Sequence, residues 1–193
     1  MFSEKGGGLL NEILNVIKTR RSIRRFLPEQ IKDEEIQTII EAAIHAPSGH
    51  NEQPWHFTVI QNKELIDHFS NVIKKLMAES EVEWIASMGR NEKLHIFYNA
   101  PTVIVVSGRK NAYSALIDCS AATQNMLLAA HSIGLGSCWI GLIRFLFKIE
   151  EEVRKLALPE GYEPFFAVAL GYPDPTKQPR PIERKRDVVN YIK

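Results

Sequence analysis

The chain has 193 residues, of which 45% are hydrophobic and 24% are charged, as expected for a single globular domain. Its net charge of +1 argues against a general nucleic-acid binder, because such domains usually present a strongly basic face. No apolar run approaches the ~18 residues of a membrane span, and the start MFSEKGGGLL lacks a signal-peptide pattern. The two cysteines, Cys119 and Cys138, are too few for a disulfide framework, so we expect a cytoplasmic protein with reduced thiols and no bound metal.

The first part of the chain predicts two helices separated by a basic segment. We expect residues 1–8 to form a flexible leader, and an amphipathic helix to run from Leu9 to about Thr19, because apolar residues recur there at helical spacing. A second helix is expected from an N-cap at Asp33 to a stop before Pro47, with acidic residues in its first turn. Between the two helices lies the densest charge cluster of the chain, formed by Lys18, Arg20, Arg21, Arg24 and Arg25.

Beyond a polar loop, strands and helices alternate. We expect strands at 55–61, 102–108, 136–141 and 165–171, helices at 63–78, 114–133 and 146–157, and partial helix within 79–99. The run at 102–108 is β-branched almost throughout, which is typical of a strand covered on both faces. The alanine-rich helix at 114–133 favours close packing on more than one side, as in a buried or dimer-spanning helix, with Gly134 as its C′ residue.

The elements alternate irregularly, without the regular rhythm of a parallel winding. We therefore predict an α+β layer structure formed by one domain over residues 9–193. From residue 172 onward the chain is rich in proline and basic residues, so we expect an extended tail rather than a packed one.

Two stretches rich in polar side chains allow an ordinary and a functional interpretation. The segment Arg20–Arg24 is either a solvated charged turn or a phosphate clamp, because guanidinium groups bind phosphate bidentately and Ser22 adds a donor. The loop at 46–55 is either a helix-to-strand turn or a surface on which Ser48, Asn51 and Gln53 read the edge of a heterocycle.

Two further stretches carry the same ambiguity. Gly141, after the strand at 136–141, is either a strand end or a position where the backbone approaches a flat ligand closely. The basic tail is either solvated or a source of further cations for the same phosphate, through Arg180, Arg184, Lys185 and Arg186.

The usual catalytic motifs are absent from the sequence. It contains no GxSxG, HExxH, P-loop or CxxC, and its six histidines are scattered, with only His50 inside the polar loop. Binding loops without an acid–base set predict that a cofactor carries the chemistry.

Taken in order, these stretches resemble the FMN-dependent nitroreductase family. The resemblance runs from about Ile13 to Val189 and rests on RRSIRRF, AAIHAPSGHNEQPWHF, NAPTVIVV, DCSAATQNMLLAAHSIGLGSCWIG and FAVALGYP. It implies a three-layer fold with a central mixed, mainly antiparallel sheet flanked by helices. It also implies an interlocked homodimer whose tail, residues 172–193, reaches the partner subunit, with two FMN molecules at the interface.

The same resemblance implies a set of FMN contacts. Arg20, Arg21, Ser22 and Arg24 would bind the phosphate, the ribityl chain and the pyrimidine end. Pro47, Ser48, Gly49 and Asn51 would contact the flavin from the other subunit. Trp139, Ile140 and Gly141 would lie along the isoalloxazine, with the Gly141 backbone N–H near N5, and Arg184 and Arg186 would approach the phosphate, with Lys185 competing for that role.

The implied activity is electron transfer from NADH or NADPH, by a ping-pong mechanism, to nitroaromatic, quinone or similar small acceptors. Two alternatives stay open: a specialised relative such as a dehalogenase, a flavin-consuming or an azoline-oxidising enzyme, and a flavin-binding protein without turnover. The segment between the 102–108 strand and the long helix is shorter than in many relatives, so the pocket roof would depend mainly on residues 79–99. We expect neither nucleic acid nor a membrane as a partner.

Overall fold

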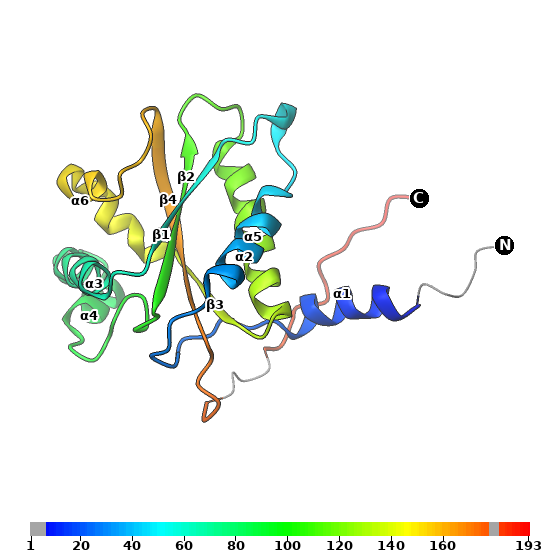
Figure 1. The fold of residues 1–193 in the computed structure, drawn as a ribbon, viewed down its shortest axis with the longest axis horizontal. Helices are drawn as coiled ribbons and strands as arrows, with labels where there is room; N and C mark the ends of the chain where they lie inside the picture. Colours follow the sequence, from blue (N-terminus) through cyan, green and yellow to red (C-terminus); the bar gives the residue numbers. More distant parts are fainter. Residues whose placement is uncertain (1–6, 178–181) are drawn as a thin grey trace.

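The computed structural model describes residues 7–177 and 182–193 (Figure 1). The helices and strands are, in chain order, α1 (Gly7–Thr19), α2 (Asp33–Ile44), β1 (Trp55–Ile60), α3 (Lys63–Ala78), α4 (Glu83–Arg90), β2 (Thr102–Arg109), α5 (Ala115–Ser132), β3 (Gly136–Ile140), α6 (Glu150–Arg154) and β4 (Tyr162–Gly171). Two short 3₁₀ helices, η2 (Gly49–Asn51) and η3 (Gly141–Lys148), lie after α2 and after β3.

The four strands form one sheet in the order β1-β2-β4-β3. Every pairing between these strands is antiparallel, which places β2 and β4 in the centre and leaves β1 and β3 at the edges. The predicted α+β class is confirmed. The expected mixed character of the sheet is limited, among the described residues, to an isolated parallel bridge between Ser22 and Ser137.

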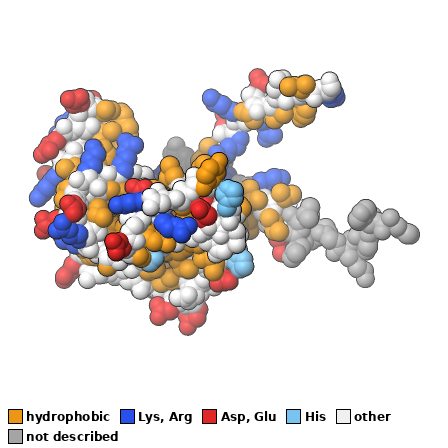
Figure 2. Space-filling model, turned by 90° about the horizontal axis from the view of Figure 1, so that it is seen from above, with side chains coloured by type: hydrophobic (Ala, Val, Ile, Leu, Met, Phe, Trp, Pro, Cys, Tyr) orange, Lys and Arg blue, Asp and Glu red, His pale blue; other side chains and the backbone are white. Residues whose placement is uncertain are grey.

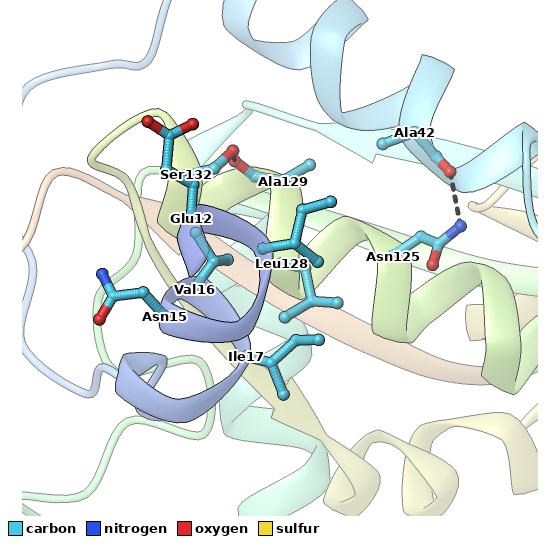
Figure 3. Close-up of a pocket in the computed structure, with 10 residues that line it drawn as sticks. Glu12, Asn15, Val16, Ile17, Ala42, Asn125, Leu128, Ala129 and Ser132 are labelled. Carbon is cyan, nitrogen blue, oxygen red and sulfur yellow. Dashed lines mark hydrogen bonds between the residues drawn. The ribbon is translucent and has the colours of Figure 1, made fainter. Parts of the chain in front are cut away.

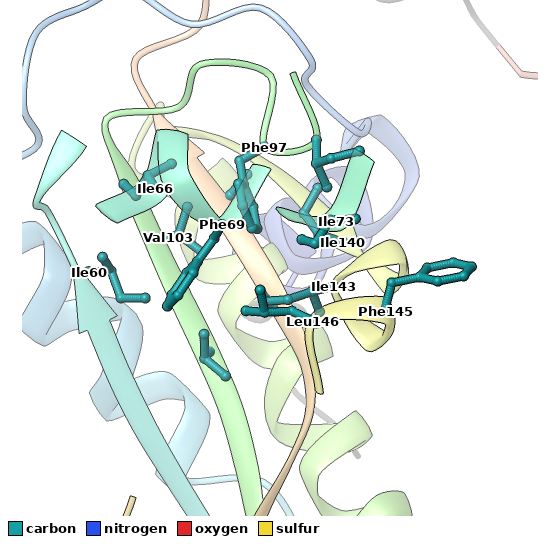
Figure 4. Close-up of a cluster of buried hydrophobic side chains, with 14 of the residues drawn as sticks. Ile60, Ile66, Phe69, Ile73, Phe97, Val103, Ile140, Ile143, Phe145 and Leu146 are labelled. Atoms are coloured by element: carbon teal, nitrogen blue, oxygen red, sulfur yellow. The ribbon is translucent and has the colours of Figure 1, made fainter. Parts of the chain in front are cut away.

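Hydrophobic side chains cover both faces of the sheet, as the β-branched run in β2 predicted. Alternate residues of β2 enter two different clusters: Val103 and Val105 face one side, and Ile104 and Val106 face the other. The first cluster contains Phe69 and Ile73 of α3, together with residues of α4 and η3 (Figure 4). The second is closed by α2 and α5, so helices, sheet and helices form three layers.

Several predicted boundaries move by a few residues. The N-cap of α2 is Lys32 rather than Asp33, because the Lys32 N–H donates to Glu35 Oε2 at 2.8 Å. The helix α1 begins at Gly7, so the last two residues of the expected leader are helical, while residues 1–6 lie outside the described part. The helical segment expected at 146–157 begins earlier, because η3 starts at Gly141 directly after β3.

The helix α1 and the end of the tail extend from the same side of the body (Figure 1). Along α1, the side chains of Ile13, Leu14 and Ile17 are 57%, 44% and 49% exposed. The space-filling view shows one arm of described residues standing away from the body, with hydrophobic and charged side chains exposed along it (Figure 2). In the part of the chain that the structure describes, no helix is long and apolar enough to cross a membrane.

Candidate functional site

The basic segment after α1 lies along the free edge of β3. The Ile23 N–H donates to the Ser137 carbonyl at 2.9 Å, next to the parallel bridge between Ser22 and Ser137. Farther along, the Leu27 N–H donates to the carbonyl of Tyr172 at 2.9 Å, just after β4. The segment therefore extends the sheet at its open edge, and its backbone position is set by hydrogen bonds rather than by charge.

The cations of this segment gather with those of the tail. Arg184, Lys185 and Arg186 line a cavity of about 700 Å³ together with Lys18 and Arg21. Burial lowers the pKa of Arg20, and the nearby positive charges of Arg184 and Arg21 lower it further. Mutual repulsion of this kind is relieved by a bound anion, so the arrangement suits a phosphate.

These positions bear on the expected role of the tail. The structure brings Arg184 and Arg186 to the basic segment of their own chain, with Lys185 beside them. Arg180 lies outside the described residues. The start of the tail is packed rather than loose, because the Tyr172 hydroxyl donates to Glu35 Oε2 at 2.8 Å; residues 182–193 are exposed.

The end of β3 carries three of the expected contacts. The Trp139 ring packs against Phe166, with centroids 4.5 Å apart, whereas Ile140 points to the opposite face and is buried. At Gly141 an added Cβ would meet no heavy atom of the described chain within 4 Å, and its φ lies outside the left-handed region. The fold therefore gives no reason for glycine at this position, whereas a ligand lying close to the backbone would give one.

Arg24 lies beside Tyr98 and Cys138, neither of which was expected at the site from the sequence. Its guanidinium carbon is 5.7 Å from the centroid of the Tyr98 ring, on one side of a cavity of about 360 Å³. Burial raises the pKa of the Cys138 thiol, and the neighbouring Arg24 guanidinium offsets part of that rise. Lys93, His95 and Asn99 line the same cavity, so residues from the end of 79–99 do form part of a pocket beside the basic segment.

The polar loop after α2 is held by the start of α5. The Gly49 N–H donates to both carboxylate oxygens of Asp118 at 3.3 Å, and the Ser114 hydroxyl donates to them at 2.9 and 3.0 Å. A Cβ at Gly49 would come within 2.5 Å of Ser114 Oγ, so a side chain there would displace the hydroxyl that bonds Asp118.

Within this loop, side chains and backbone are held in an unusual conformation. The Ser48 hydroxyl accepts from the Gln53 N–H at 3.1 Å, and the Gln53 side chain donates to Asn51 Oδ1 at 3.1 Å. His50, Asn51 and Gln53 all have left-handed φ values, of 53°, 54° and 45°. Pro47 and Asn51 are exposed, and non-glycine residues in this region carry strain that often marks functional loops.

The basic segment and the polar loop lie at opposite ends of the sheet. The loop leads into Trp55, which pairs through Gly108 with Glu163, whereas Ser137 pairs with Leu170 at the other end of β4. Seven positions along a strand correspond to roughly 23 Å. The structure therefore brings together Arg20, Arg21, Ser22, Arg24, Arg184 and Arg186 near the edge of β3, and leaves Pro47, Ser48, Gly49 and Asn51 apart from them in the same chain.

An apolar groove of about 580 Å³ runs between α1 and the helices α2 and α5 (Figure 3). Val16 and Ile17 of α1 lie across it from Leu128 and Ala129 of α5. At the other end of α5, Leu116 and Ile117 are 54% and 72% exposed. Apolar side chains left uncovered on this scale are typical of surfaces that bind another protein.

Three side chains near the basic segment or the polar loop were not identified from the sequence. Asp118 holds the polar loop, and a single acid in an otherwise apolar helix was a usable signal for it. Burial and the charges of Arg20 and Arg21 lower the pKa of His131, which lies 2.9 Å from Thr19 Oγ1. Tyr98 carried no signal, because only the folded chain brings it to Arg24.

Comparison with known proteins agrees with this architecture. The model of the nitroreductase family matches residues 17–172. A protein of Archaeoglobus fulgidus, whose name refers to NADH dehydrogenase and NAD(P)H nitroreductase, is 37% identical over 173 residues, covering 87% of this chain and 89% of its own. The solved structure of a nitroreductase with bound FMN from Bacteroides fragilis is 32% identical, with a TM-score of 0.85 over 95% of this chain and all of the other.

The three-layer fold is thus shared with solved structures of FMN-bound nitroreductases. The chain belongs to the nitroreductase family. Similarity extends to proteins with other substrates: an iodotyrosine deiodinase structure with FMN and 3-iodo-L-tyrosine is 26% identical, with a TM-score of 0.76 over 94% of this chain and 99% of the other.

Proposed function

We propose that the chain is an FMN-dependent oxidoreductase, which takes electrons from NADH or NADPH and passes them to nitroaromatic, quinone or similar small acceptors. The observation that carries this proposal is the gathering of Arg20, Arg21, Arg184 and Arg186 at the edge of β3, where Ser22 pairs with Ser137. Family membership and the FMN-bound relative support the same cofactor.

The residues present fit the cofactor. A phosphate monoester carries about −1.5 to −2 charges, which matches the cluster of half-buried and tail guanidinium groups. Ser22 supplies a hydroxyl donor between these cations and Arg24. Gly141 leaves its backbone open, and Trp139 and Ile140 fix the strand end on which it lies. We therefore propose that these residues hold the phosphate, the ribityl chain and one edge of the flavin ring.

The complete site is proposed to form in a homodimer. The basic segment and the polar loop lie at opposite ends of the sheet, so one chain does not present both to the same ligand. In a dimer with twofold symmetry, the loop residues Ser48, Gly49 and Asn51 of one subunit meet the basic segment of the other. The uncovered apolar side chains of α1 and α5 offer surfaces for that association.

The chemistry then needs no acid–base side chain from the protein. Bound FMN supplies two-electron transfer between nicotinamide and acceptor. The chain's own residues bind the phosphate, orient the ring against β3 and offer a backbone N–H at Gly141. Donor and acceptor would use the same open face in turn, which predicts ping-pong kinetics.

The test is flavin binding by variants of the basic segment. We expect Arg24→Ala to weaken FMN binding by roughly 10–150-fold, because a charge-assisted hydrogen bond contributes about 1.5–3 kcal/mol, while the thermal midpoint of the apoprotein changes little. Binding is measured by quenching of FMN fluorescence. Arg154→Ala makes the same chemical change on the exposed surface of α6 and serves as the matched control.

Equal FMN affinity of the two variants and the wild type would contradict the proposed clamp. Anaerobic bleaching of the bound flavin by NADH and by NADPH then separates an oxidoreductase from a passive flavin binder and identifies the preferred donor. The deiodinase similarity keeps reductive dehalogenation as a second candidate reaction. A screen of nitroaromatic, quinone and halogenated aromatic acceptors on the reduced protein distinguishes the two.

A further inference from the structure

The turn that carries Tyr98 is held by one histidine. His95 Nδ1 accepts the backbone N–H groups of Phe97 and Asn99, both at 3.2 Å, and the Tyr98 N–H donates to the His95 carbonyl at 2.9 Å. Within this turn, Tyr98 and Asn99 have left-handed φ values of 57° and 56°. Such a conformation is uncommon for a bulky residue and costs about 1–3 kcal/mol, so it persists only where surrounding bonds support it.

The other nitrogen of His95 is also engaged. Nε2 lies 3.2 Å from Asp67 Oδ1 on α3, and Asp67 is itself paired with Lys63. Because Nδ1 accepts two N–H groups, the proton of the neutral ring must be on Nε2, where it donates to Asp67. The supporting bonds of the turn therefore require a neutral His95.

The turn delivers its aromatic ring to Arg24. The guanidinium carbon lies 5.7 Å from the Tyr98 ring centroid, and both residues line the cavity of about 360 Å³ beside the basic segment. A cation over an aromatic ring loses freedom to move away from it, so the ring restricts where the guanidinium can lie. Apart from Tyr98 and the Cys138 thiol, Arg24 is exposed, and without the ring its guanidinium would sample more rotamers.

We propose that Tyr98 is a positioning residue for Arg24, held in place by the His95 turn, and that this turn links FMN affinity to the protonation of His95. The inference rests on the proposed function, in which Arg24 contacts the cofactor. It adds two residues, Tyr98 and His95, that are not themselves among the expected FMN contacts.

Burial of His95, together with the charges around it, sets the direction of the pH effect. Burial lowers the pKa of His95; Asp67 opposes this, and Lys63 and Lys74 of α3 add to it. The cavity beyond the ring holds Arg24, Arg25, Lys93 and Asp174. Since the pKa of His95 is lower in the folded chain, the unfolded chain binds more protons below pH ~6.5. The free energy of unfolding therefore falls as the pH decreases from there to the pKa of the folded chain.

A double-mutant cycle tests the positioning role. We expect Tyr98→Leu to weaken FMN binding roughly 2–5-fold, the range of an exposed cation–π contact, and Tyr98→Phe to bind like the wild type because the ring remains. In an Arg24→Ala background, Tyr98→Leu is expected to cause no further loss. Fluorescence titration gives the affinities, and thermal melts of the apoproteins report folding separately.

The outcomes of the double-mutant cycle distinguish failure of the proposed clamp from failure of the positioning role alone. If Arg24→Ala binds FMN normally, the proposed clamp and this inference are both wrong. If Arg24→Ala weakens binding but Tyr98→Leu does not, or if Tyr98→Leu has the same effect in both backgrounds, only the positioning role is overturned.

The pH link is tested with His95→Asn, whose side-chain oxygen can replace Nδ1 as an acceptor but does not titrate. Between pH 7.5 and 4.5 we expect the apoprotein melting temperature to fall from about pH 6.5 downward, and FMN affinity to fall at lower pH, where folded His95 takes up a proton. Both falls are expected to be steeper in the wild type than in His95→Asn. The FMN phosphate also titrates near pH 6, but that contribution is common to both proteins and cancels in the comparison.

Asp67→Asn provides a second variant if His95→Asn does not fold. Removing the carboxylate disfavours protonated His95, so the loss of FMN affinity should move to lower pH, whereas the loss of apoprotein stability should begin at the same pH and continue further as the pH falls. Superimposable pH profiles for the wild type and the folded variants would overturn the link between His95 and FMN affinity.

Discussion

At the scale of single residues, Gly141 is a position where the fold does not require glycine, whereas a cofactor lying close to the backbone would. Its backbone does not require glycine, and a Cβ there would meet no heavy atom of the described chain within 4 Å. Gly161 also has open space around it, but its φ of +82° does favour glycine. These two positions form a matched pair in which the same substitution has opposite consequences.

We expect Gly141→Ala to fold as the wild type and to bind FMN roughly 5–150-fold more weakly, because an added methyl group in a close contact costs about 1–3 kcal/mol. Gly161→Ala should lower the free energy of unfolding by about 1–2 kcal/mol and leave FMN affinity unchanged. Thermal melts and fluorescence titration of both variants measure the two quantities. Normal FMN affinity of Gly141→Ala would show that the ring does not approach this backbone.

The basic residues stood out in the sequence because their charge is visible there. Five cations within eight residues allowed a phosphate clamp or a solvated turn, and the resemblance to the nitroreductase family implied the clamp. The folded chain gathers Arg20, Arg21 and Arg184 near β3. Asp118 and Tyr98 were not assigned. Asp118 bonds Gly49 and Tyr98 contacts Arg24, both far away in sequence, so these roles depend on contacts that no local pattern encodes.

At the scale of elements, β3 determines where the basic segment lies. Gly136 is buried on this strand, and a Cβ there would come within 2.8 Å of Ile23 Cγ2 and 2.9 Å of Ile23 Cβ. The closeness of this packing keeps the segment hydrogen-bonded to Ser137. The strand therefore acts on the cofactor site through backbone position, without contributing a charge.

We expect Gly136→Ala to push the segment away from β3, lowering the free energy of unfolding by about 1–3 kcal/mol and weakening FMN binding although every cation remains. Chemical denaturation and fluorescence titration give the two effects. Combining it with Ile23→Ala removes two of the three crowding atoms and should restore part of the affinity. Unchanged FMN binding by Gly136→Ala would mean that the position of the segment on β3 does not matter for the cofactor.

The elements themselves were predicted largely from periodicity. The strands at β1 and β2 and the helices α3 and α5 match their expected ranges to within a residue or two, because long runs with one consistent pattern leave little ambiguity. The region after β3 was less accurate. Its apolar residues, such as Ile143 and Leu146, are close to a strand in sequence, and only the packing of η3 on the sheet decides that the chain turns helical at once.

At the scale of the whole molecule, the basic segment and the polar loop are two half-sites that lie apart in one chain. Their separation leads to a test of the dimer. A clamp variant, Arg24→Ala, and a loop variant, Asn51→Ala, each lose FMN affinity in their homodimers if both half-sites are needed. In a mixed dimer, the intact clamp of one subunit faces the intact loop of the other. One of its two sites is then complete.

We expect unfolding and refolding of an equal mixture of the two variants to recover roughly one quarter of the wild-type number of tight FMN sites, since half of the dimers are mixed and each has one complete site. Each variant refolded alone recovers none. Counting tight sites by fluorescence titration, with the dimer confirmed by sedimentation, gives the result. Absence of recovery in the mixture would place both half-sites on the same chain.

The sequence by itself determined the class of fold, the buried strand β2, the identity of the basic segment and the need for a cofactor, because these depend on composition and on short-range periodicity. The tertiary structure alone decided that the polar loop and the basic segment lie at opposite ends of the sheet, and that His95 and Tyr98 support Arg24. Strand order and register create such relations between residues far apart in the chain, and local spacing carries no information about them.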